Sequence, residues 1–283
     1  MKQFIGLDVS LKDTFISVRE EERRVWRGKC ASEPRVIAEV IRNRAVNAER
    51  VVFETGSLST WLYHALTAEG LPAICIDARH AKAALDIAPN KTDANDDDGL
   101  AHLAEVGFYR EVRVKSFDSM LVRTLIAARS QLLKMTTQMS NQIGGLMKTF
   151  GLVVPKGAGR VFEENVCSLL GTNAGLEQII RPLVHAWKAI RARTAELSKQ
   201  LVASARASEQ CRLLASITGV GAVTASSFVA AIEDPANFKE SRSVGAWIGL
   251  TTRSYQSGEV DYDGHISGRV TTIFAGCYMK RRP

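Results

Sequence analysis

The stretch "FIGLDV", residues 4–9, is an apolar, strand-forming run that sets the fold of the N-terminal part of this chain. Two similar runs follow, "TFISV" (14–18) and "RVWRGKC" (24–30), and polar turn residues separate the three. β-Branched and aromatic runs bounded by turns are typical of strands. We therefore expect strands over residues 3–9, 14–18 and 25–30, arranged as a meander.

Beyond residue 33 the pattern changes to an alternation of helix and strand. Helical periodicity over 34–44 is followed by the apolar run "VVFE" (51–54), a helix over 58–69, "PAICI" (72–76) and helices beyond 78. A meander followed by helix and strand alternation predicts an α/β domain with a mixed sheet covered by helices.

The middle of the chain is helical. One apolar seam starts near residue 118, and a second runs from Leu176 to Leu201, with only Thr194 interrupting it. The seams predict a helical hairpin or a dimerising coiled coil. Pro182 belongs in the first turn of the second helix or kinks it. The residues of the first seam are Leu121, Leu125, Ala128, Leu132, Met135 and Met139.

The stretch "LLASITGVGAVTASSFVAAI" (213–232) predicts two helices joined by a turn at Gly219 and Gly221. Helix-hairpin-helix modules use such a turn to present backbone N–H groups to a phosphate. Tight packing of two helices explains the glycines about as well.

Composition limits the classes of partner and compartment. The 283 residues carry a formal net charge of +7, and the pI of about 9.3 favours a polyanionic partner. The five cysteines are widely spaced and form no Cys-x-x-Cys pair, which indicates reduced thiols in a cytoplasmic protein. No apolar run approaches the length of a membrane span, so we expect no membrane partner.

Four carboxylates stand out from this basic background. Asp8 lies inside an apolar strand and Glu54 ends another, where a charge is costly without a partner. Asp93 and Asp96, in "KTDANDDDGLA" (91–101), are three residues apart and share one face of a helix. Each has a structural alternative. Asp8 could be a turn residue at a strand end, and Glu54 precedes a turn that could cap the next helix. Asp93 could be an N-cap, with acids in the first turn favoured by the helix dipole.

Taken together, two strand-borne acids and a helix pair match a divalent-metal site for phosphodiester chemistry. Hard carboxylate oxygens are the ligands that Mg²⁺ prefers. We predict that Asp8, Glu54, Asp93 and Asp96 hold two Mg²⁺ ions, and that Asp97 and Asp98 serve the helix N-terminus or face solvent.

These blocks resemble a known family. "FIGLDVS", "VVFETGSLSTWLYHAL" (51–66) and "KTDANDDDGLA" look like the Asp, Glu and Asp-x-x-Asp blocks of the DEDD insertion-sequence transposases, the group founded on IS one-ten. "LLKMTTQMSNQIGGLMKTFGL" (132–152) resembles the central helix of that family, and residues 217–260 resemble its C-terminal domain. The resemblance covers about residues 3–268.

The resemblance implies an RNase H-like (RuvC-like) domain, a coiled coil through which the chain forms a homo-oligomer, and a small, mainly α C-terminal domain. It implies a transposase that cuts and rejoins the DNA of element ends and target. Ser257, in "YQSG" (255–258), is the implied nucleophile, although from the sequence alone Ser254 is as good a candidate. The resemblance also implies guidance by a non-coding RNA.

The last residues depart from the family. Where the family continues with Gly-Asp-x-x-Leu-Arg-x-x-Leu-x-Glu-Ala-Ala, this chain has "RVTTIFAGCYMKRRP" (269–283). Codons shifted by one base permit each of those family residues in register. We expect residues 269–283 to be an out-of-frame tail, which puts the activity of this copy at risk. Codons that cannot give Gly-Asp and Leu-Arg in the shifted frame would disprove the frameshift.

The expected organisation is a RuvC-like domain (1–112), a helical coiled-coil segment (113–207), an incomplete C-terminal transposase domain (208–268) and the tail (269–283).

Three other functions remain open. A RuvC-like structure-specific nuclease shares the carboxylates without needing Ser257. A sugar-kinase-like ATPase requires a downstream Gly-rich phosphate loop, which we do not find near the acids. A non-catalytic nucleic-acid-binding remnant would bind in a salt-sensitive way without cleavage.

Overall fold

The computed structural model describes residues 1–85, 93–171, 174–257 and 260–266. The chain divides into an N-terminal unit, Met1–Lys115, and a C-terminal unit, Ser116–Pro283. The tail predicted to be out of frame lies outside the described residues, and the further boundary predicted at residue 207 stays a prediction.

A five-stranded mixed sheet forms the framework of the N-terminal unit, in the order β3-β2-β1-β4-β5. The first three strands form an antiparallel meander, and β4 and β5 run parallel to β1. The strands are β1 (Gln3–Val9), β2 (Asp13–Glu20), β3 (Arg23–Ala31), β4 (Ala48–Glu54) and β5 (Ala73–Ile76).

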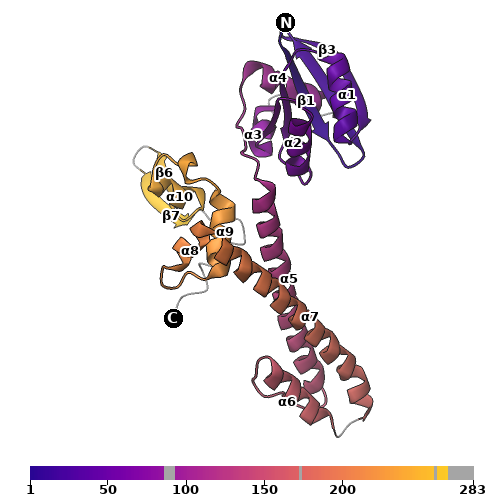
Figure 1. Cartoon of the computed structure of the whole chain (residues 1–283), viewed down its shortest axis with the longest axis vertical. Coiled ribbons are helices and arrows are strands. Elements are labelled where there is room, and N and C mark those ends of the chain that lie inside the picture. Colours follow the sequence, from indigo (N-terminus) through magenta and orange to yellow (C-terminus); the bar gives the residue numbers. More distant parts are fainter. Residues whose placement is uncertain (86–92, 172–173, 258–259, 267–283) are drawn as a thin grey trace. The chain divides into compact units, whose positions relative to one another are not determined.

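Helices cover both faces of this sheet (Figure 1). Because side chains alternate along a strand, Ile5 and Leu7 of β1 point to one face, where they pack with α1 (Pro34–Arg44) and α2 (Ser59–Ala68). On the other face, Val52 packs with α3 (Ala78–Leu85) and α4 (Asp93–Val106). The predicted meander, the alternation after it and the mixed sheet covered by helices are confirmed.

In the C-terminal unit, two long helices pack against each other: α5 (Phe117–Lys148) and α7 (Ala174–Ala207), with α6 (Arg160–Leu170) between them in the chain. Their shared core centres on Trp187, whose indole Nε1–H donates to Ser140 Oγ at 2.8 Å. A helical hairpin within the chain, one of the two predicted alternatives, is thus present.

The details of the seams differ from the prediction. Leu121 and Ala128, expected in the first seam, are exposed, while Ile126 and Ile143 are buried instead. Pro182 lies inside α7, beyond its first turn, which excludes the first of the two predicted alternatives, and a kink at Pro182 stays a prediction. A one-residue change in a 3.6-residue period turns a side chain by about 100°, so a strict four-and-three pattern misplaces such positions.

The remainder of the unit holds α8 (Glu209–Ala215), α9 (Ala222–Ile232), a short 3-10 turn η1 (Pro235–Asn237), α10 (Ser241–Trp247) and a hairpin of β6 (Thr252–Ser257) and β7 (Val260–Ile266). The predicted helix, turn and helix over 213–232 are present as α8 and α9. Gly219 has a φ of 92°, which glycine adopts without strain. The antiparallel hairpin was not predicted, and Tyr255 stacked on Tyr262 across it is the cross-strand aromatic pair that could have indicated it.

None of the described helices is both long and apolar enough to cross a lipid bilayer.

Candidate active site

Asp8 and Glu54 lie at the carboxyl ends of two neighbouring parallel strands. Leu7 of β1 is in register with Phe53 of β4, so the next residues, Asp8 and Glu54, are also side by side. Leu7 and Phe53 point towards α1 and α2, which places Asp8 and Glu54 on the opposite face, beneath α4. Both carboxylates are half-buried. The fold therefore brings these two predicted ligands to one edge and one face of the sheet.

The helix α4 contacts the sheet directly at Gly6. A Cβ atom at Gly6 would lie 2.2 Å from the carbonyl oxygen of Asp97 and 2.4 Å from the backbone nitrogen of Ala101. Real Cβ atoms do not approach backbone that closely, so only glycine permits this contact between strand and helix. Gly6 thus sets the distance between α4 and β1.

The direction of α4 follows from its contacts further along. Arg19 and Arg50 are the strand neighbours of Phe4 on β2 and β4, and they bind Glu105 and the carbonyl oxygen of Ala104. Because residue 97 lies over Gly6 and residues 104–105 lie near Phe4, α4 runs antiparallel to β1.

The first turn of α4 is consequently directed towards Asp8. Asp93 is four residues before Asp97, about 6 Å along a helix, and Asp8 is two residues beyond Gly6, about 6.6 Å along a strand. The backbone therefore brings the first turn of α4 to the edge where Asp8 and Glu54 lie. The side chains of Asp93 and Asp96 lie outside the described part of the structure.

Asp97 and Asp98 do not behave as predicted. Asp97 is fully buried, and its Oδ2 accepts a hydrogen bond of 2.8 Å from Nε of Arg27 on β3. Asp98 accepts hydrogen bonds from Ser17 Oγ at 2.9 Å and Arg19 Nη1 at 3.1 Å. The expectation of a capping or solvent-facing role for both was wrong, because the sheet face beneath α4 carries the two arginines.

Sequence reasoning missed Arg19 and Arg27 as partners of this acidic run. Burial disfavours the charged form of Arg19, but the hydrogen bonds and charges of Glu105 and Asp98 outweigh it and raise the pKa of Arg19 above its ordinary value. A basic residue at every second position of a strand, such as Arg27 and Lys29, is the pattern that could have indicated a charged sheet face.

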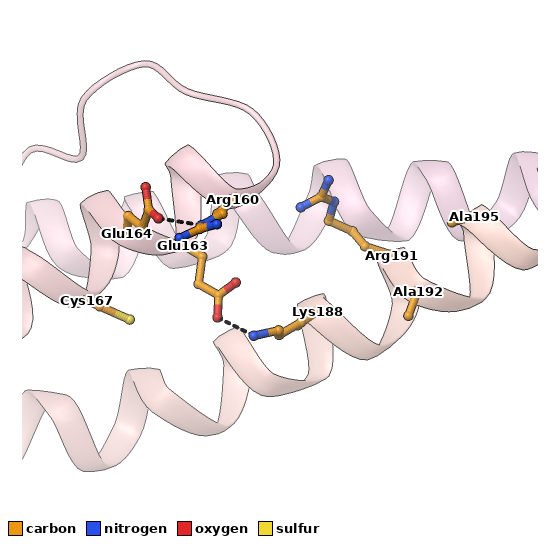
Figure 2. A pocket seen from close by; sticks show the side chains of 8 residues that line it. All are labelled: Arg160, Glu163, Glu164, Cys167, Lys188, Arg191, Ala192 and Ala195. Atoms are coloured by element: carbon orange, nitrogen blue, oxygen red, sulfur yellow. Dashed lines mark hydrogen bonds and ion pairs between the residues drawn. The ribbon is translucent and has the colours of Figure 1, made fainter.

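Two pockets differ in their relation to this site. One of about 680 Å³ opens at the carboxyl edge of the sheet and includes Glu54, the β1–β2 turn and the residues before α2. The other, of about 620 Å³, lies between α6 and α7. There the acids and bases pair with each other, as Lys188 with Glu163 and Arg160 with Glu164 (Figure 2). Only the first pocket borders a predicted site residue.

The donor set suits a hard divalent cation. Asp8 and Glu54 supply carboxylate oxygens from adjacent strands, and the approach of α4 at Gly6 brings a third backbone element to them. Among the described side chains, no group of three or more His, Cys, Asp or Glu is placed to hold a metal ion. That finding is compatible with a four-carboxylate site, because it leaves out Asp93 and Asp96.

Ser257, the predicted nucleophile, is the last residue of β6 and is in register with Val260 of β7. It therefore lies where the hairpin turns. Ser254 is three positions earlier on the same strand and is in register with Asp263.

Curated relatives are transposases. The transposase for insertion sequence element IS1111A of Coxiella burnetii is 32% identical over 217 residues, covering 74% of this chain and 58% of that protein. A probable family 20 transposase of Pseudomonas aeruginosa is 28% identical over 188 residues, covering 65% and 56%. The chain thus spans little more than half the length of these relatives.

Among solved structures, Thermus thermophilus RuvC in complex with a Holliday junction substrate is similar, at 14% identity and a TM-score of 0.30. The similarity covers 40% of this chain and 100% of that one. A second RuvC structure from the same organism has a TM-score of 0.29.

Two family models match the chain itself. A model of the DEDD transposases of IS110, described as a transposase, matches residues 5–151, and a model described as the transposase IS116/IS110/IS902 family matches residues 211–272. The first covers the site built by β1, β4 and α4, and more than half of the sequence. The chain therefore belongs to the IS110 family of DEDD transposases.

Proposed function

We propose that this chain is an insertion-sequence transposase that cuts and rejoins DNA with a Mg²⁺-dependent carboxylate site and a serine nucleophile. The observation that supports the metal site best is the convergence of three elements. Asp8 and Glu54 end adjacent parallel strands, and α4 begins over the same edge. Asp8, Glu54, Asp93 and Asp96 would hold the cations, in an RNase H-like domain.

In the proposed chemistry, bound Mg²⁺ stabilises the negative charge that develops on the attacking and leaving oxygens of a phosphodiester. The carboxylates would hold the cations at the carboxyl edge of the sheet, beside the pocket that includes Glu54. Oγ of Ser257 forms a bond to phosphorus and gives up its proton. The bond from phosphorus to a deoxyribose oxygen breaks, and that oxygen takes up a proton as a free hydroxyl.

Two further partners complete the proposal. A non-coding guide RNA selects the DNA, in keeping with the net charge of +7. A second copy of the chain binds along α5 and α7, where Leu121 and Ile179 are 67% and 61% exposed. Mixing chains that carry two different tags, and testing whether one tag recovers the other, checks this oligomer.

Covalent capture of DNA tests the proposed function. The full chain is incubated with Mg²⁺, the ends of its element and the cognate RNA, and protein–DNA adducts are resolved on a denaturing gel. We expect wild type to form an adduct and Ser257→Ala to form none, because alanine has no hydroxyl. Ser254→Ala is the matched control, which removes a hydroxyl three positions earlier on the same strand.

The outcomes separate the alternatives. Strand cleavage without any adduct, unchanged in Ser257→Ala, would indicate the structure-specific nuclease. Salt-sensitive binding of DNA without cleavage would indicate a nucleic-acid-binding remnant. An adduct that appears only when the reading frame after residue 268 is restored would show that residues 269–283 inactivate this copy.

A further inference from the structure

We propose that Arg27 is a positioning residue for the metal site: its ion pair with Asp97 fixes the rotation of α4, and so holds the first turn of that helix over the edge where Asp8 and Glu54 lie. Arg19 supports the same helix through Asp98 and Glu105. The inference rests on the proposed function, because it assigns a role towards the proposed carboxylate site.

The pair between Arg27 and Asp97 is costly for the fold. The Asp97 side chain is 0% exposed and that of Arg27 is 29% exposed. Oδ1 of Asp97 has no hydrogen-bond partner among the described residues, although Oδ2 is bound. A buried carboxylate with one unsatisfied oxygen carries a desolvation penalty that a single ion pair only partly offsets. An apolar contact of similar volume would hold α4 at least as strongly.

What the ion pair adds is a defined orientation. An apolar face tolerates rotation and sliding of a helix, whereas a hydrogen bond of 2.8 Å between Arg27 Nε and Asp97 Oδ2 does not. Asp93 begins α4 four residues before Asp97, about one helical turn away. Whatever fixes the helix at Asp97 therefore also fixes the backbone of its first turn.

Several contacts place α4 on the sheet, among them the hydrogen bonds of Ser17 to Asp98 and of Arg50 to the Ala104 carbonyl. The backbone contact at Gly6 sets its distance from β1. Arg19 holds it further along through Asp98 and Glu105, with Nε of Arg19 at 2.9 Å from Glu105 Oε2. Arg27 acts at Asp97, one helical turn from Asp93. Of the two arginines, Arg27 is bound closer to the first turn of α4, so we expect its loss to weaken metal binding more than the loss of Arg19.

Metal binding by the full chain tests this role without relying on activity. Mn²⁺ is titrated into wild type, Arg27→Gln and Asp97→Asn, and the free ion is followed by electron paramagnetic resonance. We expect both variants to bind Mn²⁺ about 10- to 100-fold more weakly, the usual effect of losing a group that orients a metal ligand. Arg27→Lys retains the positive charge but not the planar guanidinium, so we expect its Mn²⁺ affinity to lie between those of Arg27→Gln and wild type.

The matched control is Lys29→Gln. Lys29 lies two residues further along β3, on the same face, and pairs with Asp13 at 3.7 Å rather than with α4. This variant loses the same charge and should leave the Mn²⁺ affinity within about twofold of wild type, because an exposed pair contributes little. Equal weakening in Lys29→Gln and Arg27→Gln would attribute the effect to general charge and would overturn the proposal.

Thermal melting without metal separates positioning from simple stability. If Arg27→Gln and Asp97→Asn lower the melting temperature but bind Mn²⁺ as tightly as wild type, Arg27 is only structural and the inference fails. If wild type itself binds no divalent ion, the proposed metal site fails, and the inference with it. Weak Mn²⁺ binding by a folded Asp97→Asn variant, beside normal binding by Lys29→Gln, supports both.

Discussion

Replacing Asp8 with Asn is expected to reduce Mg²⁺-dependent DNA strand cleavage by about 10²- to 10³-fold or more, while the chain stays folded. Asn has nearly the same shape as Asp but lacks the negative charge that holds a divalent cation. Asp8 and Glu54 lie side by side on adjacent strands beneath the start of α4. Single-turnover cleavage of labelled element ends, with the cognate RNA present, measures the loss.

The melting temperature of Asp8→Asn, unlike its cleavage rate, is not expected to fall. Carboxylates that share a site repel each other when no metal is bound. Asp8→Asn removes one of those charges, so its melting temperature without Mg²⁺ should equal or exceed that of wild type, and the rise on adding Mg²⁺ should shrink. Activity is then lost without loss of folding.

Asp13→Asn is the matched control, because Asp13 is also an acid on the α4 face of the sheet, with a side chain 49% exposed and paired with Lys29. It should cleave DNA at a rate within about threefold of wild type, since an exposed pair is worth little. If Asp8→Asn cleaved as fast as this control, Asp8 would hold no metal.

Replacing Gly6 with Ala is expected to have the second large effect, on both stability and metal binding. The added Cβ would overlap backbone atoms of Asp97 and Ala101, and neither can move without the whole helix. Overpacking of this kind costs about 1–3 kcal/mol of unfolding free energy. Each kcal/mol lowers the melting temperature of a 60- to 100-residue domain by about 4–8 °C.

If α4 moves away from β1, its first turn moves away from Asp8. Gly6→Ala should therefore also weaken Mn²⁺ binding, measured by the same titration. Gly144→Ala makes the same substitution inside α5, where nothing lies within 4 Å of the added Cβ, and it should raise stability by about 0.5–1 kcal/mol. Loss of stability in both variants, or in neither, would show that the contact at Gly6 is not what holds α4.

Local sequence patterns predicted the elements of the N-terminal unit well. The run "FIGLDV" became β1, and the predicted helix over 34–44 became α1 with the same bounds. Such patterns depend on side chains a few residues apart, which is the range over which periodicity is defined. The β6–β7 hairpin was missed, because its polar strands lack the apolar run that marks a strand.

The candidate site shows the same limit. The residue types of Asp8 and Glu54, each a charge within or at the end of an apolar strand, marked them as unusual without any fold. Their adjacency required the parallel pairing of β1 with β4, across more than 40 residues of chain. No local pattern could reveal that Asp97 turns inwards to Arg27, since that depends on which sheet face α4 covers.

The sequence by itself determined the strands and helices of the N-terminal unit, the four acidic positions and the family, because these depend on residue type and short-range spacing. The tertiary structure alone decided which acids of the run at 93–98 lie near Asp8 and which pair with arginines. Close contact of α4 with Gly6 separates the run at 93–98 into a first turn near Asp8 and a following pair held by Arg27 and Arg19. The reason is physical: the partner of a buried charge is set by long-range packing, and not by its neighbours in the chain.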